Sequence, residues 1–246
     1  MKYVHGMSIR VLQALLILLS GFLLPGKMEA QTIDGLYTEP YPEEQVPAVV
    51  ERMSVSSSNQ EPARDGIRCI SVDAAERIAV GTSSGEQNHI CVYNSKMDFL
   101  FSISFKASGS FSIVLSEDTV WAILWRSNLC VGIAPDGSVK EVLDIPRSRE
   151  NIEYLNQAAR GDPLIVNGNI YALQNQKAVL NLTGEYSKVV VTYPAGRQEV
   201  LYDVENQMMV RLIVKVIGSC LLFALTVFCV SYWQKEKRQG ETSKGK

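Results

Sequence analysis

Three runs of apolar residues decide the fold of this chain: DTVWAI at Asp118–Ile123, NLCVG at Asn128–Gly132 and VKEVL at Val139–Leu143. Each run has the length of a strand, and turn residues such as Pro135-Asp136-Gly137 separate them. A fourth apolar run, Phe111–Leu115, precedes the three. Short apolar runs divided by turn residues are typical of β-hairpins, so the sequence predicts a unit of four antiparallel strands.

The same layout occurs three times along the chain. Ile78, Val120 and Ile170 occupy corresponding positions, which are 42 and then 50 residues apart. The strands expected in the other two units are Ile67–Val72, Glu76–Gly81, His89–Tyr93 and Phe99–Ile103 in the first, and Leu164–Val166, Gly168–Leu173, Ala178–Leu180 and Tyr186–Val191 in the third. Four strands repeated every 40 to 50 residues or so are typical of a β-propeller blade.

In this layout the chain resembles the blades of six-bladed propellers of the NHL and YWTD type, from Gly66 to about Asp203. The resemblance implies an all-β domain, residues 66–205, of about three four-stranded antiparallel blades. Propellers usually close with about four to eight blades, so three would leave two open faces. The open faces could be covered by extra edge strands from the N-terminal segment and Gln198–Val204, or by a second chain in a six-bladed homodimer. A compact all-β domain without propeller closure is the alternative.

The two ends of the chain carry apolar runs of different kinds. Val11–Leu24 follows the basic residues Lys2 and Arg10 and is too short to span a bilayer, so residues 1–30 are expected to be a signal peptide. Cleavage after Ala30 is expected, with a retained signal anchor as the alternative.

The second apolar run, Val216–Trp233, is uninterrupted and would cover about 27 Å as a helix, close to the hydrocarbon thickness of a bilayer. We therefore expect a transmembrane helix at residues 210–233, with a buried core helix as the alternative. Basic residues follow at once in the tail 234–246. This arrangement predicts a single-pass protein of the cell membrane with its N-terminal domain outside and a cytoplasmic tail.

Charge divides the chain along the same boundaries. Residues 31–209 contain 23 Asp and Glu against 14 Lys and Arg, a net charge of −9, whereas the tail carries a net charge of +3. Nucleic-acid binding needs clustered Lys and Arg, so nucleic acid is not expected as a partner. The bilayer is the partner that the tail indicates, because its basic residues suit anionic headgroups.

The segment 31–65 contains Pro40, Pro42, Pro47 and Pro62 and the run Ser56–Gln60. This composition is typical of an extended linker. A strand at Ala48–Val55 is the one ordered element that we expect in it.

No residues form a convincing catalytic or metal-binding pattern. Cys69, Cys91 and Cys130 lie in apolar runs and are expected to be core side chains, and no cofactor or metal is indicated. Gly81–Gly85 matches the G-x-S-x-G motif of hydrolases, but a strand rather than a helix is expected after it. We therefore expect a protein that is not an enzyme, with an exported hydrolase as a remote alternative; His89 would then be the histidine available.

One insertion departs from the strand pattern. Ser148–Arg160 reads as a short helix that begins after the cap Ser148 and ends at Gly161. Because insertions between blades often carry binding residues, Ile152, Tyr154, Leu155 and Arg160 form the candidate binding surface; a helix that only fills a gap is the alternative. Asn181-Leu182-Thr183 is an N-glycosylation sequon.

Two functional classes remain open. The first is a membrane-anchored binding or scaffold module for a protein, a peptide or a glycan. The second is a receptor-like sensor that transmits ligand binding through association of its helices. The tail has room to recruit a partner but not for a signalling domain, so the first class is favoured.

Overall fold

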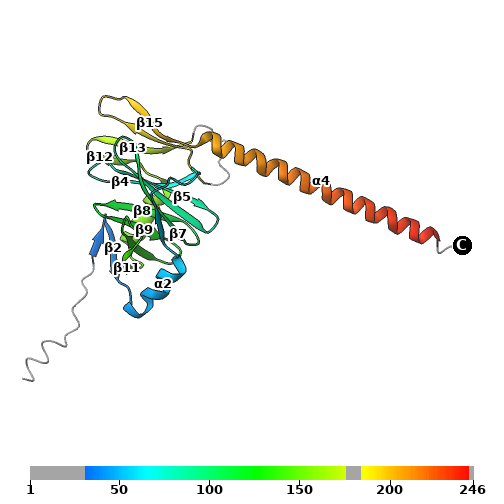
Figure 1. Cartoon of the computed structure of the whole chain (residues 1–246), viewed down its shortest axis with the longest axis horizontal. Coiled ribbons are helices and arrows are strands. Elements are labelled where there is room, and N and C mark those ends of the chain that lie inside the picture. The colour runs from blue at the N-terminus through cyan, green and yellow to red at the C-terminus, as the bar shows by residue number, and fades with distance from the viewer. Residues whose placement is uncertain (1–30, 176–183, 244–246) are drawn as a thin grey trace, which may run out of the picture.

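The computed structural model describes residues 31–175 and 184–243, with side chains as far as Thr226 and at Cys229 (Figure 1). The expected signal peptide at 1–30 and the sequon at Asn181 lie outside these residues. The described chain is dominated by strands, which form three antiparallel sheets, and one long helix leaves the β-domain at its C-terminal end.

Sheet I contains the first predicted unit and has five strands in the order β3-β7-β6-β5-β4. Sheet II contains the second unit and has six strands in the order β1-β2-β11-β10-β9-β8. The strands of the two units are β4 (Ile67–Val72), β5 (Ile78–Ser84), β6 (Gln87–Tyr93), β7 (Phe99–Lys106), β8 (Phe111–Ser116), β9 (Thr119–Leu124), β10 (Leu129–Ile133) and β11 (Val139–Asp144). All eight of these predicted strands are confirmed, and each set of four pairs as an antiparallel meander.

Sheet III is built from β12 (Leu164–Val166), β13 (Asn169–Gln174), β14 (Lys188–Thr192) and β15 (Gln198–Asp203). Its strand assignment differs from the prediction, because Ala178–Leu180 lies outside the described residues and β14 pairs directly with β13. β15, which was expected to be an extra edge strand, is therefore the fourth strand of this sheet. The all-β class is confirmed, but the sheets have four to six strands and are not three four-stranded propeller blades.

The expected linker contributes ordered elements. These are β1 (Gln31–Ile33), β2 (Leu36–Pro40), a 3-10 turn η1 (Glu43–Gln45), helix α2 (Val46–Met53) and β3 (Ser56–Ser58). The strand expected at Ala48–Val55 is wrong: Val49 and Met53, four residues apart, share the buried face of α2. β2 and β3 add to outer strands of sheets II and I, where backbone groups would otherwise lack partners.

Sheet I lies between the other two sheets. Along β6, Ile90 and Val92 point into a cluster shared with sheet II and α2, whereas Cys91 and Tyr93 point into a cluster shared with sheet III. β9 is also apolar on both faces, since Ala122 faces sheet I while Ile123 faces the outer cluster of sheet II. β8 and β10 flank this strand in sheet II.

The predicted helical insertion is confirmed as α3 (Arg149–Arg160). The Ser148 side chain accepts a hydrogen bond from the Asn151 backbone N–H at 3.1 Å, and Gly161 ends the helix in the left-handed conformation. Tyr154 and Leu155 pack against the outer cluster of sheet II. The helix therefore covers one of the two faces that a three-unit domain would leave open.

Helix α4 (Glu205–Ser243) follows β15 without a linker. Its segment Glu205–Thr226 has a mean hydropathy of 2.1 and is not buried within the described chain, so it is long and apolar enough to cross a membrane. In Figure 1 the helix projects away from the sheets. The prediction of one helix of membrane-spanning length at this end is confirmed.

The strands define two rims of the domain. The Leu115 backbone N–H donates to Ser71 Oγ at 2.9 Å, and Gly81, the strand partner of Cys69, lies close to Phe111 and Ile113. β4 and β8 therefore lie side by side and run in the same direction. We call the end where β4, β8 and β14 begin and α4 starts the helix-side rim. The opposite end, which carries the turns at 73–77, 117–118 and 167–168, is the far rim.

Candidate binding cleft

Hydrogen bonds between sheets close the far rim. Arg77 of the β4–β5 turn donates to the Glu117 carbonyl oxygen of the β8–β9 turn. The Asn167 side chain donates to Glu76 Oε1 at 3.2 Å and to the Ala74 carbonyl oxygen at 3.1 Å. Because turns of all three sheets are joined here, the far rim leaves little room for a ligand.

The helix-side rim contains a cleft of about 410 Å³. Sheets I and II, the C-terminal end of α3 and the segment that precedes β14 enclose it. The cleft is lined by Arg68, Cys69, Ser83, Gly85, Gly109, Ser110, Phe111, Trp125, Ala158, Ala159, Gly184 and Tyr186. Its walls thus combine two large polar-tipped aromatic residues, one cation and several hydroxyl groups.

Trp125 is fixed in the cleft wall by two hydrogen bonds. Its indole Nε1–H donates to Ser112 Oγ at 3.0 Å, and its backbone N–H donates to the Ser110 carbonyl oxygen at 3.2 Å. Its ring also packs against the outer cluster of sheet II. A rigid aromatic side chain loses little conformational entropy on binding, which suits it to ligand contact.

The opposite wall depends on a bridge between β4 and the chain before β14. Ile67 and Tyr186 exchange two backbone hydrogen bonds, of 2.9 Å and 2.8 Å. Beside them Arg68 pairs with the buried carboxylate of Glu185 at 3.0 Å. A Cβ on Gly66 would lie within 2.9 Å of three Glu185 atoms, so glycine is needed for this close approach. The bridge holds Arg68 and Tyr186 together at the cleft.

The predicted binding residues of α3 do not form one surface. Ile152 is 52% exposed, Tyr154 and Leu155 point into the sheet II cluster, and Arg160 forms an exposed pair with Asp162 at 3.1 Å. The helix reaches the cleft through Ala158 and Ala159 instead. The backbone of Arg160 contacts a residue that lines the cleft, since Tyr186 Oη donates to the Arg160 carbonyl oxygen at 3.3 Å.

Asn151, which the sequence did not single out, attaches α3 to the domain. Its side chain accepts a hydrogen bond from the Tyr37 backbone N–H at 2.9 Å and donates to the carbonyl oxygens of Tyr37 at 2.9 Å and Pro146 at 2.8 Å. The residue is 1% exposed. A single amide thus satisfies both backbone groups of Tyr37 in β2 and fixes the helix that forms one wall of the cleft.

Among the described residues, the histidine is not hydrogen-bonded to the serine of the G-x-S-x-G match. Ser83 of the G-x-S-x-G match lies near the end of β5, and strand β6 follows the turn. His89 Nδ1 lies 2.8 Å from Ser104 Oγ on β7, its hydrogen-bond partner in this region. Burial raises the pKa of Cys69, so this thiol at the cleft stays protonated. The expected burial of Cys69, Cys91 and Cys130 is confirmed.

The start of α4 is attached to the cleft wall. Arg211 forms an ion pair with Asp65, a buried residue two positions before Ile67. Lys188 at the start of β14 contacts Asp203 and Glu205, both at 3.1 Å. Met208 packs against the cluster shared by sheets I and III. The first turns of the helix are therefore part of the β-domain.

The outer face of sheet III is uncovered among the described residues. Ile165 is 73% exposed and Val200 is 51% exposed, and Ile170 lies on the same sheet with 39% exposure. This is the second of the two open faces that a three-unit domain was expected to leave.

No protein-family model and no curated protein sequence matches the chain. Among solved structures, it is similar to the crystal structure of Saccharomyces cerevisiae Sqt1, with 16% identity and a TM-score of 0.26. The match covers 60% of this chain and 35% of that chain, so it spans about a third of the solved protein. At this TM-score the likeness carries no argument about fold or function.

Proposed function

We propose that the chain is a single-pass, membrane-anchored binding module whose ligand occupies the cleft at the helix-side rim. The cleft is the observation that carries this proposal. Its volume of about 410 Å³ lies in the range of ligand sites, roughly 300 to 1,000 Å³. Its ligand is a short segment of a protein, a peptide or a glycan.

The cleft walls support this ligand class. Trp125 and Tyr186 offer flat apolar surfaces with polar tips, which suit both sugar rings and extended peptide side chains. Ser83 and Ser110 add hydroxyl groups that can donate or accept hydrogen bonds. The Arg68–Glu185 pair adds a donor-rich group beside them.

Helix α4 supports the anchor. Its exposed apolar surface has no partner among the described residues, and a bilayer would satisfy it. The basic tail supports an orientation with the β-domain outside the cell and the tail in the cytoplasm.

Site-directed photocrosslinking in cells that make the protein tests the cleft. A benzoylphenylalanine replaces Ser83, which lines the cleft, or Ser116, which is exposed at the far end of β8. We expect adducts from position 83 and none from position 116, and mass spectrometry of the adduct identifies the ligand class. Equal labelling from both positions, or none from position 83, would contradict the proposal.

A receptor-like sensor is the second candidate, and the attachment of α4 to the cleft wall favours it. Arg68 lines the cleft, and Asp65 three residues earlier holds Arg211 of the helix. Occupation of the cleft would then change the environment of the first turns of α4. This is tested by hydrogen exchange of the amides of residues 205–211, measured before and after addition of the ligand that crosslinking identifies. Unchanged exchange would exclude the sensor and leave the binding module as the proposed function.

Self-association is the remaining proposal, supported by the uncovered face of sheet III. A second copy would bury Ile165 and Val200 in an isologous contact. The mass of the full chain in detergent, measured by light scattering, is expected to be that of a dimer. Ile165→Asp and Val200→Asp should give monomers, whereas Leu100→Asp, at an exposed residue of sheet I, should not. A monomeric wild type would contradict this proposal.

A further inference from the structure

A second cleft, of about 370 Å³, lies beside the first on the helix-side rim. Three connections contribute residues to both clefts and separate them: the β5–β6 turn, the β7–β8 connection and the β9–β10 turn. Helix α2 closes the other side of the second cleft. The buried side chains of Met53 and Leu124 contribute to its apolar part.

Three cations surround this cleft: Arg52 of α2, Lys106 at the end of β7 and Arg126 of the β9–β10 turn. Each is exposed, and none has an ion pair or a side-chain hydrogen bond within the part of the chain that the structure describes. Glu86 is the one acidic residue among those that line the cleft. The cleft therefore has an excess of two positive charges.

The backbone also places Arg126 at the cleft. Gly109 has a φ of +91°, and a Cβ at this position would lie 3.2 Å from the Cβ of Arg126. The β7–β8 connection can thus pass close beside the stem of Arg126 only because residue 109 is glycine. Close packing of the stem leaves the guanidinium group as the part that can reach a ligand.

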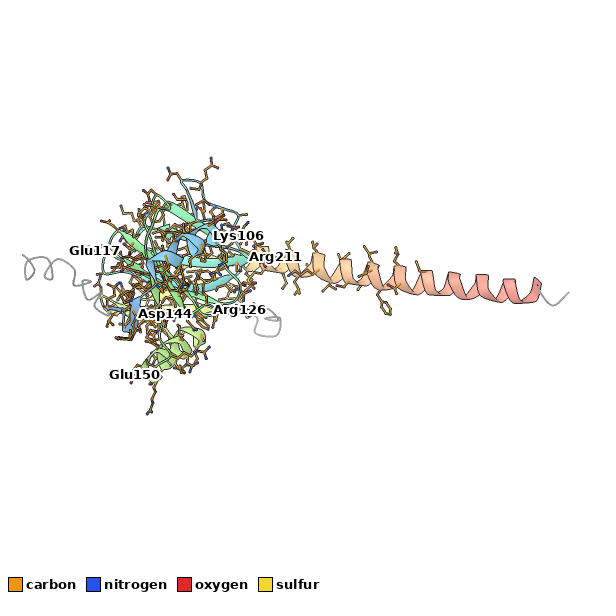
Figure 2. The ribbon with its side chains drawn as sticks, turned by 90° about the horizontal axis from the view of Figure 1, so that it is seen from below. Lys106, Glu117, Arg126, Asp144, Glu150 and Arg211 are labelled. Atoms are coloured by element: carbon orange, nitrogen blue, oxygen red, sulfur yellow. The ribbon has the colours of Figure 1, made fainter. Side chains whose placement is uncertain are left out.

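The cations of the cleft lie at the end of the domain where α4 begins. Figure 2 shows Lys106, Arg126 and Arg211 on the side of the domain from which α4 leaves, whereas Glu117 and Glu150 lie on the opposite side and Asp144 lies between them. The exported residues 31–209 have a net charge of −9. Exposed cations that have no partner within the described domain can attract an anion, because a cluster of one sign raises the local concentration of counter-ions.

We propose that the cleft formed by Arg52, Lys106 and Arg126 binds the phosphate group of an anionic lipid headgroup in the membrane that α4 crosses. This inference rests on the membrane anchor of the proposed function, but not on the ligand of the first cleft. The phosphate would accept hydrogen bonds from the two guanidinium groups and the ammonium group. Binding would fix the tilt of the domain on the bilayer.

Hydrogen exchange of the full chain in lipid nanodiscs tests the proposal. The nanodiscs contain phosphatidylcholine alone or phosphatidylcholine with phosphatidylglycerol. We expect amides of 106–110 and 125–128 to exchange more slowly with the anionic lipid. Lys106→Glu and Arg126→Glu each change the local charge by two, so each should reduce this slowing by more than the factor of about five expected for the loss of one basic residue at an anionic surface. Lys96→Glu is the matched control, since Lys96 is an exposed lysine of the far rim.

Several results would overturn the inference. Equal exchange in the two kinds of nanodisc, or a slowing that both charge reversals leave unchanged, would show that the cleft does not bind the headgroup. The same slowing by inorganic phosphate in phosphatidylcholine nanodiscs would identify a site for free phosphate instead. Incorporation of the chain into nanodiscs tests the anchor independently, and crosslinking from position 83 tests the first cleft, so the failure of each proposal can be recognised separately.

Discussion

Replacement of Asn151 by alanine tests how α3 is attached to the β-domain. The side chain makes three hydrogen bonds, of 2.8 to 2.9 Å, to backbone groups of Tyr37 and Pro146. A net hydrogen bond contributes about 1 kcal/mol, and buried groups left without partners cost at least as much. Asn151→Ala should therefore lower the free energy of unfolding by about 3 kcal/mol.

Thermal unfolding of the full chain in detergent micelles, followed by tryptophan fluorescence, measures this change. Trp121 and Trp125 pack against the same cluster as Tyr154 and Leu155 of α3, so two of the three tryptophans report on the region that is perturbed. For a domain of this size, 1 kcal/mol shifts the melting temperature by about 2 to 4 °C, and the expected decrease is about 6 to 12 °C.

Two further variants make the interpretation specific. Asn156→Ala on the exposed side of α3 is the matched control and should change the melting temperature little. Asn151→Asp keeps the acceptor for Tyr37 but loses both donors, so it should destabilise the protein about as much as alanine does. If Asn151→Ala were indistinguishable from Asn156→Ala, the amide would not attach the helix, and the account of the cleft wall would be refuted.

Three other changes have expected outcomes. Gly81→Ala would place a Cβ 2.6 Å from Cys69 Sγ and 2.8 Å from Ile113 Cδ1, so overpacking should cost about 1 to 3 kcal/mol in urea unfolding. Burial raises the pKa of Cys91 and of Cys130 to about 12, so iodoacetamide at neutral pH should modify them only after unfolding, and modification of the folded protein would contradict this packing. Burial lowers the pKa of His89 from 6.5; the unfolded chain then binds more protons, so stability should fall as pH drops through 6.5 toward the folded pKa, and His89→Gln should weaken this dependence.

The first two strand units could be predicted because each strand is specified by its own residues. In β9, side chains alternate between two apolar faces, and turn residues at Asn128 and Pro135–Gly137 divide the strands that follow. Helix α3 could be predicted for the same reason, since Ser148 and Gly161 mark its two ends. The apolar length of α4 made it recognisable without any tertiary contact.

The segment before Ile67 could not be predicted in the same way. Val49 and Val50 favour a strand by propensity. The segment is nevertheless a helix, because Val49 and Met53 are four residues apart and share one face that is buried against sheets I and II. β3 consists of serines and has no apolar pattern; it pairs with β7 because that edge has free backbone groups. Such pairing depends on a neighbour that is distant in sequence.

The candidate sites could not be predicted from the sequence either. The residues predicted on α3 were chosen for sharing a helix face, yet Tyr154 and Leu155 are used to pack the helix, and the cleft is lined by Ala158 and Ala159. Trp125 could have been singled out as an aromatic residue next to a turn, and the structure leaves it half-buried. Arg68, Tyr186 and the Arg52, Lys106 and Arg126 group lie far apart in sequence, and no local pattern joins them.

The sequence by itself determined the β-class of the domain, the strands of its first two units, the helical insertion and one helix of membrane-spanning length. These features depend on periodicity, caps and turns, which act over a few residues. Only the tertiary structure decided which elements cover each sheet, which rim closes and which remains open, and which side chains meet there. Those outcomes depend on backbone pairing and burial between segments that are tens of residues apart, as in the approach of Asn151 to Tyr37.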